Sequence, residues 1–458
     1  MAPLASIILA AGQGTRMKSD QPKVIHPILG KPMLAYTVDT ARECGADPVL
    51  VVVGFAGQMV IDTMGPELEY VWQHEQLGTG HAVMMVREKL ASRDGDLLVL
   101  YGDTPLLPAE TVRQLVELKR KEGAKAAILT LEMRDPYGYG RIIRDGAGNI
   151  TGIVEEKDAT ADQKKISEVN TGVYCFEISE LLAALDKLSP RNAQGEYYLT
   201  DVFKILVDGG MKVVGFKSDS AEAVMGPNDR VQLARTQNYL KQRINEHWMR
   251  EGVTILDPDF TYIGPDVTIG QDTVILPGTM ILGKCSIGAN CTIGPHTRII
   301  DSVIGPDTLI ENSQVLQSSL GKANLIGPFA FIRPGTVTAE QVKVGDFVEL
   351  KNCQIAPGSK VPHLTYLGDT EVGAGVNIGA GTITCNYDGV HKHRTIIGDG
   401  AFIGCNANLV APVKVGAGAT VGAGSTITKE VPAGALGVAR SRQENKLQWR
   451  SPRDRASK

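Results

Sequence analysis

The chain is poor in aromatic residues, nearly balanced in charge and free of long hydrophobic runs. Aromatic side chains make up only 5% of its 458 residues, so its cores must be filled mainly by small aliphatic side chains. A formal net charge of −4 gives no sign of the basic surface with which proteins bind nucleic acids or anionic membranes. No apolar run approaches the ~20 residues that a membrane-spanning helix needs. The length predicts two or more domains, each with its own core.

The sequence also lacks a pattern of paired cysteines. Its seven cysteines are odd in number and irregularly spaced, and no CxxC pair occurs. This pattern argues against a disulfide framework or a zinc site and predicts reduced thiols in a cytoplasmic protein. The apolar segment 4–11 lacks the basic flank of a signal peptide and runs straight into Gly12-Gln13-Gly14, so we predict a buried first strand.

Residues 1–229 alternate short aliphatic segments with amphipathic ones. The pattern predicts strands at 5–10, 49–53, 97–101, 126–131 and 213–216, and helices at 33–43, 80–89 and 110–121. Such alternation predicts an α/β domain with a mostly parallel, Rossmann-like sheet that is covered on both faces. Ligands are then expected at the carboxyl ends of the strands.

The second half of the chain repeats an aliphatic residue every six positions, usually with glycine after it. This repeat predicts inward-facing side chains at Ile263, Ile269, Ile275, Ile281, Ile287, Ile293, Ile299, Ile304, Ile310, Leu316, Ile326, Ile332, Val344, Leu350, Ile397, Ile403, Leu409, Val415, Val421 and Ile427. Helices repeat near 3.6 residues and strands near 2, so a sustained period of six fits neither alone. It is typical of a left-handed parallel β-helix of hexapeptide repeats, in which three faces close one triangular coil. We place this domain at 252–458; such prisms are frequently acyltransferases.

Segment 229–250 lies between the two halves and lacks glycine and proline. Its apolar residues can form one helical stripe with charged residues opposite. It is either a linker helix, which we place at 230–251, or the last helix of the first domain. At the other end, the basic segment 440–458 is expected to be a loose or partner-dependent arm, with a solubilising tail as the alternative.

A glycine loop follows the first predicted strand, at Leu9-Ala10-Ala11-Gly12-Gln13-Gly14-Thr15-Arg16-Met17. Backbone N–H groups of such a loop can approach a phosphate chain, and Arg16 adds positive charge. No GK[ST] follows and the third glycine is missing, so the loop is neither a Walker sequence nor a Rossmann fingerprint. Alone, it is nearly as well explained by a tight turn. Further polar segments strengthen the phosphate site: 22–23, 76–80, 101–103, 139–141 and 170–172, with Gln73, Glu155 and Asn228.

Together these residues resemble the sugar-1-phosphate nucleotidyltransferases, for which the LxxGxGTRM loop and a following lysine are specific. The resemblance implies that Arg16 and Lys23 are catalytic and stabilise charge on the UTP phosphates. It also implies that Asp103 and Asn228 bind Mg²⁺, which keeps waters and takes phosphate oxygens. For Asp103 alone, a turn or helix-capping aspartate is the alternative. The implied UTP and sugar-nucleotide site consists of Leu9, Ala10, Ala11, Gly12, Lys23, Gln73, Gly78, Thr79, Tyr101, Gly102, Asp103, Gly140, Glu155, Asn170 and Asn228.

The implied reaction needs no protein nucleophile. A sugar phosphate oxygen attacks the α-phosphorus of UTP, and pyrophosphate leaves. The protein supplies alignment and positive charge, as in other phosphoryl transfers.

The hexapeptide repeat breaks at three places, which suggests a second site. They are His363-Leu364-Thr365-Tyr366-Leu367-Gly368-Asp369, Asn377-Ile378-Gly379-Ala380-Gly381 and Thr384-Cys385-Asn386-Tyr387-Asp388-Gly389. Interruptions of a solenoid place loops on one face, often the binding face. The imidazole of His363 can take a proton from an attacking amine, and Arg333 and Lys351 can bind a sugar phosphate. A surface or packing histidine is the alternative.

With both halves in this order, the chain resembles the family of bifunctional bacterial enzymes that make UDP-N-acetylglucosamine. The pair HLTYLGD and NIGAGTITCNYDG is specific to that family, and the resemblance covers nearly the whole chain. It implies acetyl transfer from acetyl-CoA to glucosamine 1-phosphate, then uridylyl transfer from UTP to the product, which would feed cell-wall and lipid A synthesis. His363 would be the general base, and Glu349 would orient a neighbour. Glucosamine 1-phosphate would contact Arg333, Lys351, Tyr366 and Asn377, and acetyl-CoA would contact Ala380, Asn386, Tyr387, Cys405, Ala423 and Arg440.

The resemblance further implies a homotrimer, with acetyl-CoA sites between prisms and the tail of one chain reaching a neighbour. Cys405 departs from the family pattern, in which serine is more frequent; because a thiol is a weak hydrogen-bond partner, we expect a backbone contact there. The alternative function is a sugar-1-phosphate nucleotidyltransferase whose β-helix is a non-catalytic scaffold, although such tails lack the loops at 363–366 and 386–387. A third candidate is a sugar-binding or signalling protein without catalysis.

Overall fold

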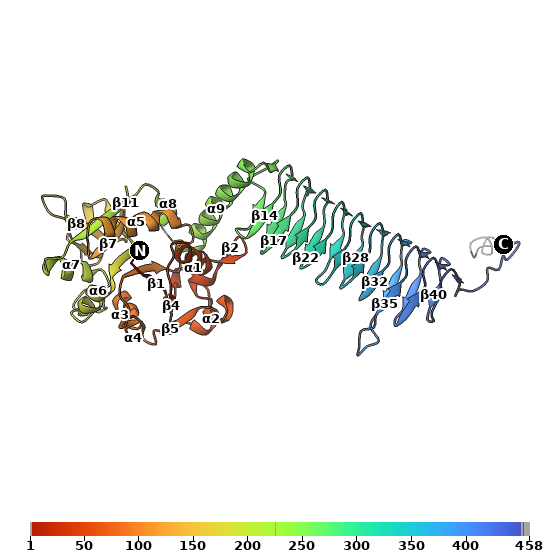
Figure 1. The fold of residues 1–458 in the computed structure, drawn as a ribbon, viewed down its shortest axis with the longest axis horizontal. Coiled ribbons are helices and arrows are strands. Elements are labelled where there is room, and N and C mark those ends of the chain that lie inside the picture. The colour runs from red at the N-terminus through yellow and green to blue at the C-terminus, as the bar shows by residue number, and fades with distance from the viewer. Residues whose placement is uncertain (1, 225, 450–451, 453–458) are drawn as a thin grey trace. The chain divides into compact units, whose positions relative to one another are not determined.

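The computed structural model describes residues 2–224, 226–449 and 452 of the chain (Figure 1). The chain divides into two compact units, Met1–Leu240 and Lys241–Lys458. The first is an α/β unit and the second is a β-helix, as the two sequence patterns predict. Over the part of the chain just given, no helix is both long and apolar enough to cross a membrane.

The first unit is built on a central sheet with helices on both faces. The strands are β1 (Leu4–Ala10), β2 (Pro27–Ile28), β3 (Lys31–Pro32), β4 (Val49–Val53), β5 (Glu69–Trp72), β6 (Asp96–Tyr101), β7 (Ala126–Glu132), β8 (Arg141–Arg144), β9 (Ile150–Val154), β10 (Glu168–Glu177) and β11 (Val213–Ser218). The helices are α1 (Met33–Glu43), α2 (Gly57–Met64), α3 (Thr79–Met84), α4 (Arg87–Leu90), α5 (Ala109–Lys121), α6 (Ile178–Leu185), α7 (Asp201–Asp208) and α8 (Ala221–Val224), with 3-10 turns η1 (Thr15–Met17), η2 (Lys23–Ile25) and η3 (Gln163–Lys165). The sheet order is β11-β7-β10-β6-β1-β4-β5.

The centre of this sheet is parallel and apolar. Strand β1 pairs in parallel with β4 and β6, and every residue of β1 and β4 is buried. Buried residues of α3, α4, α6 and α7 form one core, and those of α1, α2, α5 and α8 form the other. Strands that read as continuous aliphatic runs are those covered on both faces, which is the arrangement found here.

Strand β10 interrupts the parallel order. It lies antiparallel between β6 and β7, and its register shifts between Asn170 and Tyr174. The sequence pattern did not predict this strand, because its partners are distant in the chain and no tight turn precedes it. The predicted helix at 80–89 is also two short helices, α3 and α4, whereas α1 and β4 have the predicted bounds.

The second unit is a three-sided prism of parallel strands, one strand of each sheet per coil. The first prism sheet contains β12 (Thr254–Ile255), β15 (Val274–Ile275), β18 (Thr292–Ile293), β21 (Leu309–Ile310), β24 (Leu325–Ile326), β27 (Lys343–Asp346), β30 (Lys360–His363), β33 (Asn377–Ile378), β36 (Phe402–Ile403), β39 (Thr420–Val421) and β41 (Leu436–Gly437). The second contains β13 (Tyr262–Ile263), β16 (Met280–Leu282), β19 (Arg298–Ile300), β22 (Gln314–Leu316), β25 (Phe331–Ile332), β28 (Glu349–Lys351), β31 (Tyr366–Gly368), β34 (Ile383–Cys385), β37 (Asn408–Val410) and β40 (Thr426–Ile427). The third contains β14 (Val267–Ile269), β17 (Cys285–Ile287), β20 (Val303–Ile304), β23 (Ser319–Leu320), β26 (Val337–Thr338), β29 (Gln354–Ile355), β32 (Thr370–Val372), β35 (Thr395–Ile397) and β38 (Val413–Val415).

The repeating aliphatic residues form a single core inside the prism. One predicted position is wrong: Val315 is fully buried, whereas Leu316 is only partly buried. Ile299 pairs with Val315, and Ile300 pairs with Leu316, so a face of five residues rather than six precedes Val315. The repeat in this coil is therefore one residue shorter than the sequence pattern assumes.

A long helix, α9 (Arg230–Arg250), precedes the first coil, and the boundary between the two units falls within it. In the second unit, Ile244 and Trp248 of this helix pack against the prism core. The buried Asn245 amide donates hydrogen bonds to the carbonyls of Pro258 and Thr261, at 2.9 and 3.0 Å. This half of α9 covers the open first coil, as a solenoid end requires.

Candidate functional site

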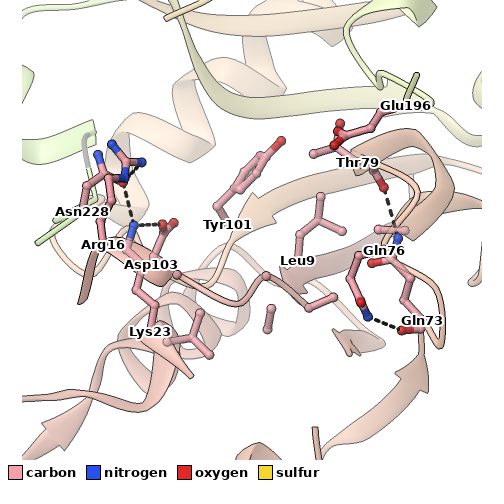
Figure 2. Close-up of a pocket in the computed structure, with 17 residues that line it drawn as sticks. Leu9, Arg16, Lys23, Gln73, Gln76, Thr79, Tyr101, Asp103, Glu196 and Asn228 are labelled. Carbon is pink, nitrogen blue, oxygen red and sulfur yellow. Dashed lines mark hydrogen bonds and ion pairs between the residues drawn. The ribbon is translucent and has the colours of Figure 1, made fainter. Parts of the chain in front are cut away.

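A cavity of about 380 Å³ lies at the carboxyl ends of β1 and β6 in the first unit (Figure 2). It is lined by Leu9, Ala10, Ala11, Gly12, Gly14, Arg16, Lys23, Val24, Gln73, Gln76, Gly78, Thr79, Ala82, Tyr101, Asp103, Glu196 and Asn228. Most of the predicted nucleotide-binding residues are in this set. In Figure 2, Arg16, Lys23, Asp103 and Asn228 lie at one end and Gln73, Gln76 and Thr79 at the other.

The glycine loop follows β1 directly and bends around Lys23. Gly14 has a φ of +64°, and a side-chain carbon on it would lie 2.6 Å from Lys23 Cβ. A larger residue at position 14 would therefore be strained and would displace Lys23. A side-chain carbon on Gly12 would meet nothing within 4 Å, so the backbone there is open to a ligand.

Two cations and two oxygen donors meet at one end of the cavity. The Lys23 ammonium lies 2.5 Å from Asp103 Oδ2 and donates to Asn228 Oδ1 at 3.0 Å. Arg16 Nη2 donates to the same Asn228 oxygen at 2.9 Å. The site therefore offers two positively charged side chains that can bind phosphate oxygens. It also offers two side-chain oxygens, from Asp103 and Asn228, that can bind a metal cation.

These oxygens suit Mg²⁺, although they do not form a complete metal site by themselves. A carboxylate and an amide oxygen converge on one ammonium group, so this point of the cavity favours positive charge. Across the described ranges, no three His, Cys, Asp or Glu side chains gather to hold a metal ion. Mg²⁺ prefers oxygen ligands and completes its shell with water and phosphate, so the donor set fits that ion.

The opposite end of the cavity is a polar loop at 73–80. The buried Gln73 amide donates to the carbonyl of Gly78 at 3.1 Å. Gly78 has a φ of +109°, and a side-chain carbon on it would lie 2.6 Å from the Tyr197 carbonyl. Thr79 Oγ1 accepts a hydrogen bond from the Leu199 N–H at 3.1 Å. Segment 197–199 thus holds this loop in place at the border of the cavity.

Gly140, Glu155 and Asn170 lie together beside the cavity. Gly140 precedes β8 and Glu155 follows β9, so the hairpin brings them side by side. A side-chain carbon on Gly140 would lie 3.5 Å from both Glu155 Cδ and Asn170 Cβ. Burial raises the pKa of Glu155, although Thr200 Oγ1 donates to it at 3.0 Å. The three residues are therefore neighbours, although Gly140 and Glu155 are not among the residues that line the cavity.

A smaller cavity of about 150 Å³ adjoins the first and shares Tyr101, Asp103 and Asn228 with it. Asn170 lines this smaller cavity, so it connects the hairpin residues to the larger cavity. Gly102 lines neither cavity; a side-chain carbon there would lie 2.9 Å from Leu34. Its place is beneath the site, where a larger residue would disturb the packing.

The predicted set missed some residues that line the main cavity. Val24, Ala82 and Glu196 were not among the predicted ligand contacts. Ala82 follows Thr79 by one helical turn in α3, so helical spacing could have found it. Nothing local marks Glu196, which reaches the cavity only because segment 197–199 pairs with the 77–80 loop.

On the prism, three of the predicted acetyl-CoA residues, Ala380, Cys405 and Ala423, form a column at the edge where the first and second prism sheets meet, whereas Asn386 and Tyr387 lie outside it. Asp346 pairs with His363 in adjacent coils. The strand registers extend this column through Ala380 and Cys405 to Ala423. A side-chain carbon on Gly424 would lie 3.9 Å from Arg440 Cδ, so the exposed Arg440 stands at the end of the column. The three residues that follow His363 in this column, Ala380, Cys405 and Ala423, all have small side chains.

The histidine at the foot of this column has a carboxylate partner. His363 Nδ1 is in hydrogen-bond contact with Asp346 Oδ1, and both side chains remain partly exposed. No motif in the sequence marks Asp346. The signal that could have found it is distance along the chain: Asp346 lies 17 residues before His363, which is one coil.

The predicted sugar-phosphate residues lie mainly on the second prism sheet. Arg333 Nη1 lies 2.6 Å from Glu349 Oε1, so these two side chains form an ion pair across adjacent coils. A side-chain carbon on Gly368 would lie 2.5 Å from Tyr366 Oη and 2.6 Å from Asn386 Nδ2, so these two groups are neighbours. Lys351 pairs with Gly368 in the next coil. One face of the prism thus carries most of this set.

Two cations face each other above that sheet. The Lys392 ammonium contacts Lys351 and, together with desolvation, lowers the pKa of Lys351. Lys392 belongs to the projecting loop 386–394. The backbone of Lys392 forms an isolated antiparallel β-bridge with that of the exposed Tyr387. Two adjacent ammonium groups favour an anion between them.

Asn377 does not join this group within one chain. It begins β33 on the first prism sheet, whereas Tyr366 begins β31 on the second. The end of the predicted C-terminal arm, at 450–451 and 453–458, lies outside the described residues.

Comparisons with known proteins agree with both halves. Residues 6–167 match the family described as MobA-like NTP transferase domain, residues 255–370 match GMPPB C-terminal domain, and residues 394–429 match Bacterial transferase hexapeptide (six repeats). The chain is 52% identical over 441 residues to "Bifunctional protein GlmU" of Heliobacterium modesticaldum, covering 96% of each chain. It is 53% identical over 449 residues to the protein of that name from Caldanaerobacter subterraneus, covering 98% of each. The Halalkalibacterium halodurans protein of that name is 51% identical over 441 residues, covering 96% of this chain and 97% of its own.

Proposed function

Because the chain belongs to the family of bifunctional GlmU proteins, we propose that it carries out both steps that lead from glucosamine 1-phosphate to UDP-N-acetylglucosamine. The prism transfers acetyl from acetyl-CoA to the amine of glucosamine 1-phosphate. The first unit then joins the product to UTP and releases pyrophosphate. The reaction sequence makes this protein a supplier of activated sugar for cell-wall and lipid A synthesis.

In the first unit, the end of the cavity that holds Arg16 and Lys23 receives the UTP phosphates. Asp103 and Asn228 would hold Mg²⁺, which supplies positive charge to the phosphates when bound. The loop at 73–80 holds the uridine nucleotide, and the group at 140, 155 and 170 holds the sugar. The protein contributes alignment and charge rather than a nucleophile.

In the prism, His363 accepts the proton of the attacking amine. Acetyl-CoA lies along the column of Ala380, Cys405 and Ala423, and Tyr387 and Arg440 flank it. The cations of Arg333 and Lys351 hold the sugar phosphate. The observation that carries this proposal is the column itself, because it aligns His363 with the small side chains of Ala380, Cys405 and Ala423 in successive coils.

We also propose that the working form is a homotrimer in which neighbouring copies complete the acetyl-transfer site. Phe329, Phe347 and Leu364 are exposed by more than half and stand in adjacent coils beside His363. All three have left-handed φ values, and the Phe329 and Phe347 rings stack at 5.4 Å. Large apolar side chains presented this way mark an interaction surface. The separation of Asn377 from the sugar-phosphate group agrees with a site that two copies share.

A cytoplasmic location is part of the same proposal. All seven cysteines are free thiols, which suits a reducing compartment. UTP and acetyl-CoA are both substrates of the proposed reactions.

The decisive experiment compares the wild type with His363→Ala. CoA release from acetyl-CoA, with and without glucosamine 1-phosphate, is measured by mass spectrometry, since the protein's own thiols would confuse a colour reagent. We expect sugar-dependent release that falls about 100- to 10,000-fold in His363→Ala, while pyrophosphate release from UTP and N-acetylglucosamine 1-phosphate is retained. His296→Ala is the matched control, because His296 lies at the same prism edge in an earlier coil.

Acetyl transfer that survives in His363→Ala would reduce the prism to a scaffold. Sedimentation in the same buffer tests the assembly: a monomer with full acetyl transfer would refute the shared site.

A further inference from the structure

We infer that Asp346 is a positioning residue for acetyl transfer, which holds the His363 imidazole with Nδ1 protonated and Nε2 free to accept a proton. This inference rests on the proposed function, because it assumes that His363 is the general base. It concerns how the chain selects one of two imidazole tautomers.

The backbone fixes the distance between the two side chains. Asp346 ends β27, His363 ends β30, and the two residues are paired across adjacent coils. A side-chain carbon on Gly345 would lie only 1.9 Å from the Pro362 carbonyl oxygen. The two coils therefore approach as closely as a glycine allows, directly before both residues. The contact between Asp346 and His363 follows from this close approach rather than from flexible side chains.

A carboxylate can only accept a hydrogen bond, so contact with Nδ1 requires the proton to be on that nitrogen. A neutral imidazole carries one ring proton, which leaves the lone pair on Nε2. The hydrogen bond with His363 lowers the pKa of Asp346, and Lys343 on the same strand contributes positive charge. Asp346 therefore remains an acceptor at neutral pH.

The acetyl transfer then balances without a further reactant. The amine nitrogen of glucosamine 1-phosphate forms a bond to the acetyl carbon, and the carbon–sulfur bond of the thioester breaks. The amine proton passes to His363 Nε2, and the imidazolium returns it to the departing CoA thiolate. Asp346 keeps its negative charge throughout and stabilises the imidazolium.

Asp346→Asn tests the inference with little change of shape. The carboxamide can present an N–H to Nδ1 and so favour the tautomer that has the proton on Nε2. We expect kcat for acetyl transfer to fall about 100-fold or more, with KM for both substrates and acetyl-CoA affinity by calorimetry unchanged. Asp307→Asn is the matched control, because Asp307 is an exposed aspartate of an earlier coil that pairs with Lys322.

A double variant separates positioning from structural support. If Asp346 acts through His363, then adding Asp346→Asn to His363→Ala lowers the residual rate no further. An additional loss in the double variant, or a loss of acetyl-CoA affinity in Asp346→Asn, would show a structural role and overturn the inference.

The same series distinguishes this inference from the proposed function. Inactive His363→Ala with wild-type kcat in Asp346→Asn refutes only the role of Asp346. An assembled wild type without sugar-dependent CoA release, or a fully active His363→Ala, refutes the acetyltransferase itself and the inference with it.

Discussion

The two units assemble their sites over very different distances along the chain. In the first unit, Arg16 meets Asn228 across 212 residues. In the prism, His363 meets Asp346 across 17 residues, and Arg333 meets Glu349 across 16. A solenoid brings together residues one coil apart, whereas an α/β sheet brings together the ends of strands in an order that the sequence does not state. Contacts between neighbouring coils of the prism can therefore be predicted from their spacing along the chain. The contacts around the cavity of the first unit cannot.

Of the variants Lys23→Ala, Val315→Ala and Cys405→Ser, the first is expected to have the largest effect, and it tests whether the two sites are separable. It removes the ammonium group that contacts both Asp103 and Asn228. We expect pyrophosphate release to fall about 100- to 1,000-fold, because a fixed charge that stabilises the phosphates is lost. CoA release should remain at the wild-type rate.

Lys165→Ala is the control for that variant, since Lys165 is an exposed lysine of the same unit that pairs with Asp162. A parallel fall of acetyl transfer in Lys23→Ala would contradict the independence of the two sites.

Val315→Ala and Leu316→Ala test whether the six-residue spacing correctly predicts which side chains are buried in the prism core. Val315 is fully buried in the core, whereas Leu316 is only partly buried. We expect Val315→Ala to lower the free energy of unfolding of the prism by about 2 kcal/mol, through lost burial and the cavity left behind. Leu316→Ala should cost less, although it removes more atoms. Thermal unfolding monitored by circular dichroism measures both; the reverse ranking would place Leu316 inside.

Cys405→Ser is expected to have the smallest effect. The Cys405 carbonyl accepts a hydrogen bond from the Gly424 N–H at 2.8 Å, so the backbone shape of the column does not depend on the thiol. The KM for acetyl-CoA should stay nearly unchanged. A large change would show that the side chain contacts the ligand, and that the departure from serine alters binding.

The same contrast explains which elements could be predicted. Strand β4 and helix α1 have the predicted bounds because their apolar patterns are continuous. The antiparallel β10 was missed because its pairing with β6 and β7 joins distant segments. Counting failed at Leu316, because the face before Val315 has five residues and no glycine lies between Ile310 and Val315 to mark it.

The candidate sites show the same limits. Lys23 and Asp103 could be selected by motif, but their direct contact could not be read from a separation of 80 residues. Asp346 carries no motif, and its role becomes visible only once the length of a coil is known. The tautomer of His363 follows from that neighbour and not from the histidine itself.

The half of α9 that covers the first coil has a consequence for fragments of this protein. Without Ile244, Asn245 and Trp248, the first coil would expose core side chains and leave the carbonyls of Pro258 and Thr261 unpaired. The edge of such a coil pairs readily with other edges. A C-terminal fragment that begins at Gly252 is therefore expected to associate end to end into fibres. A fragment that begins at Arg230 keeps helix α9 over the first coil and is expected not to polymerise.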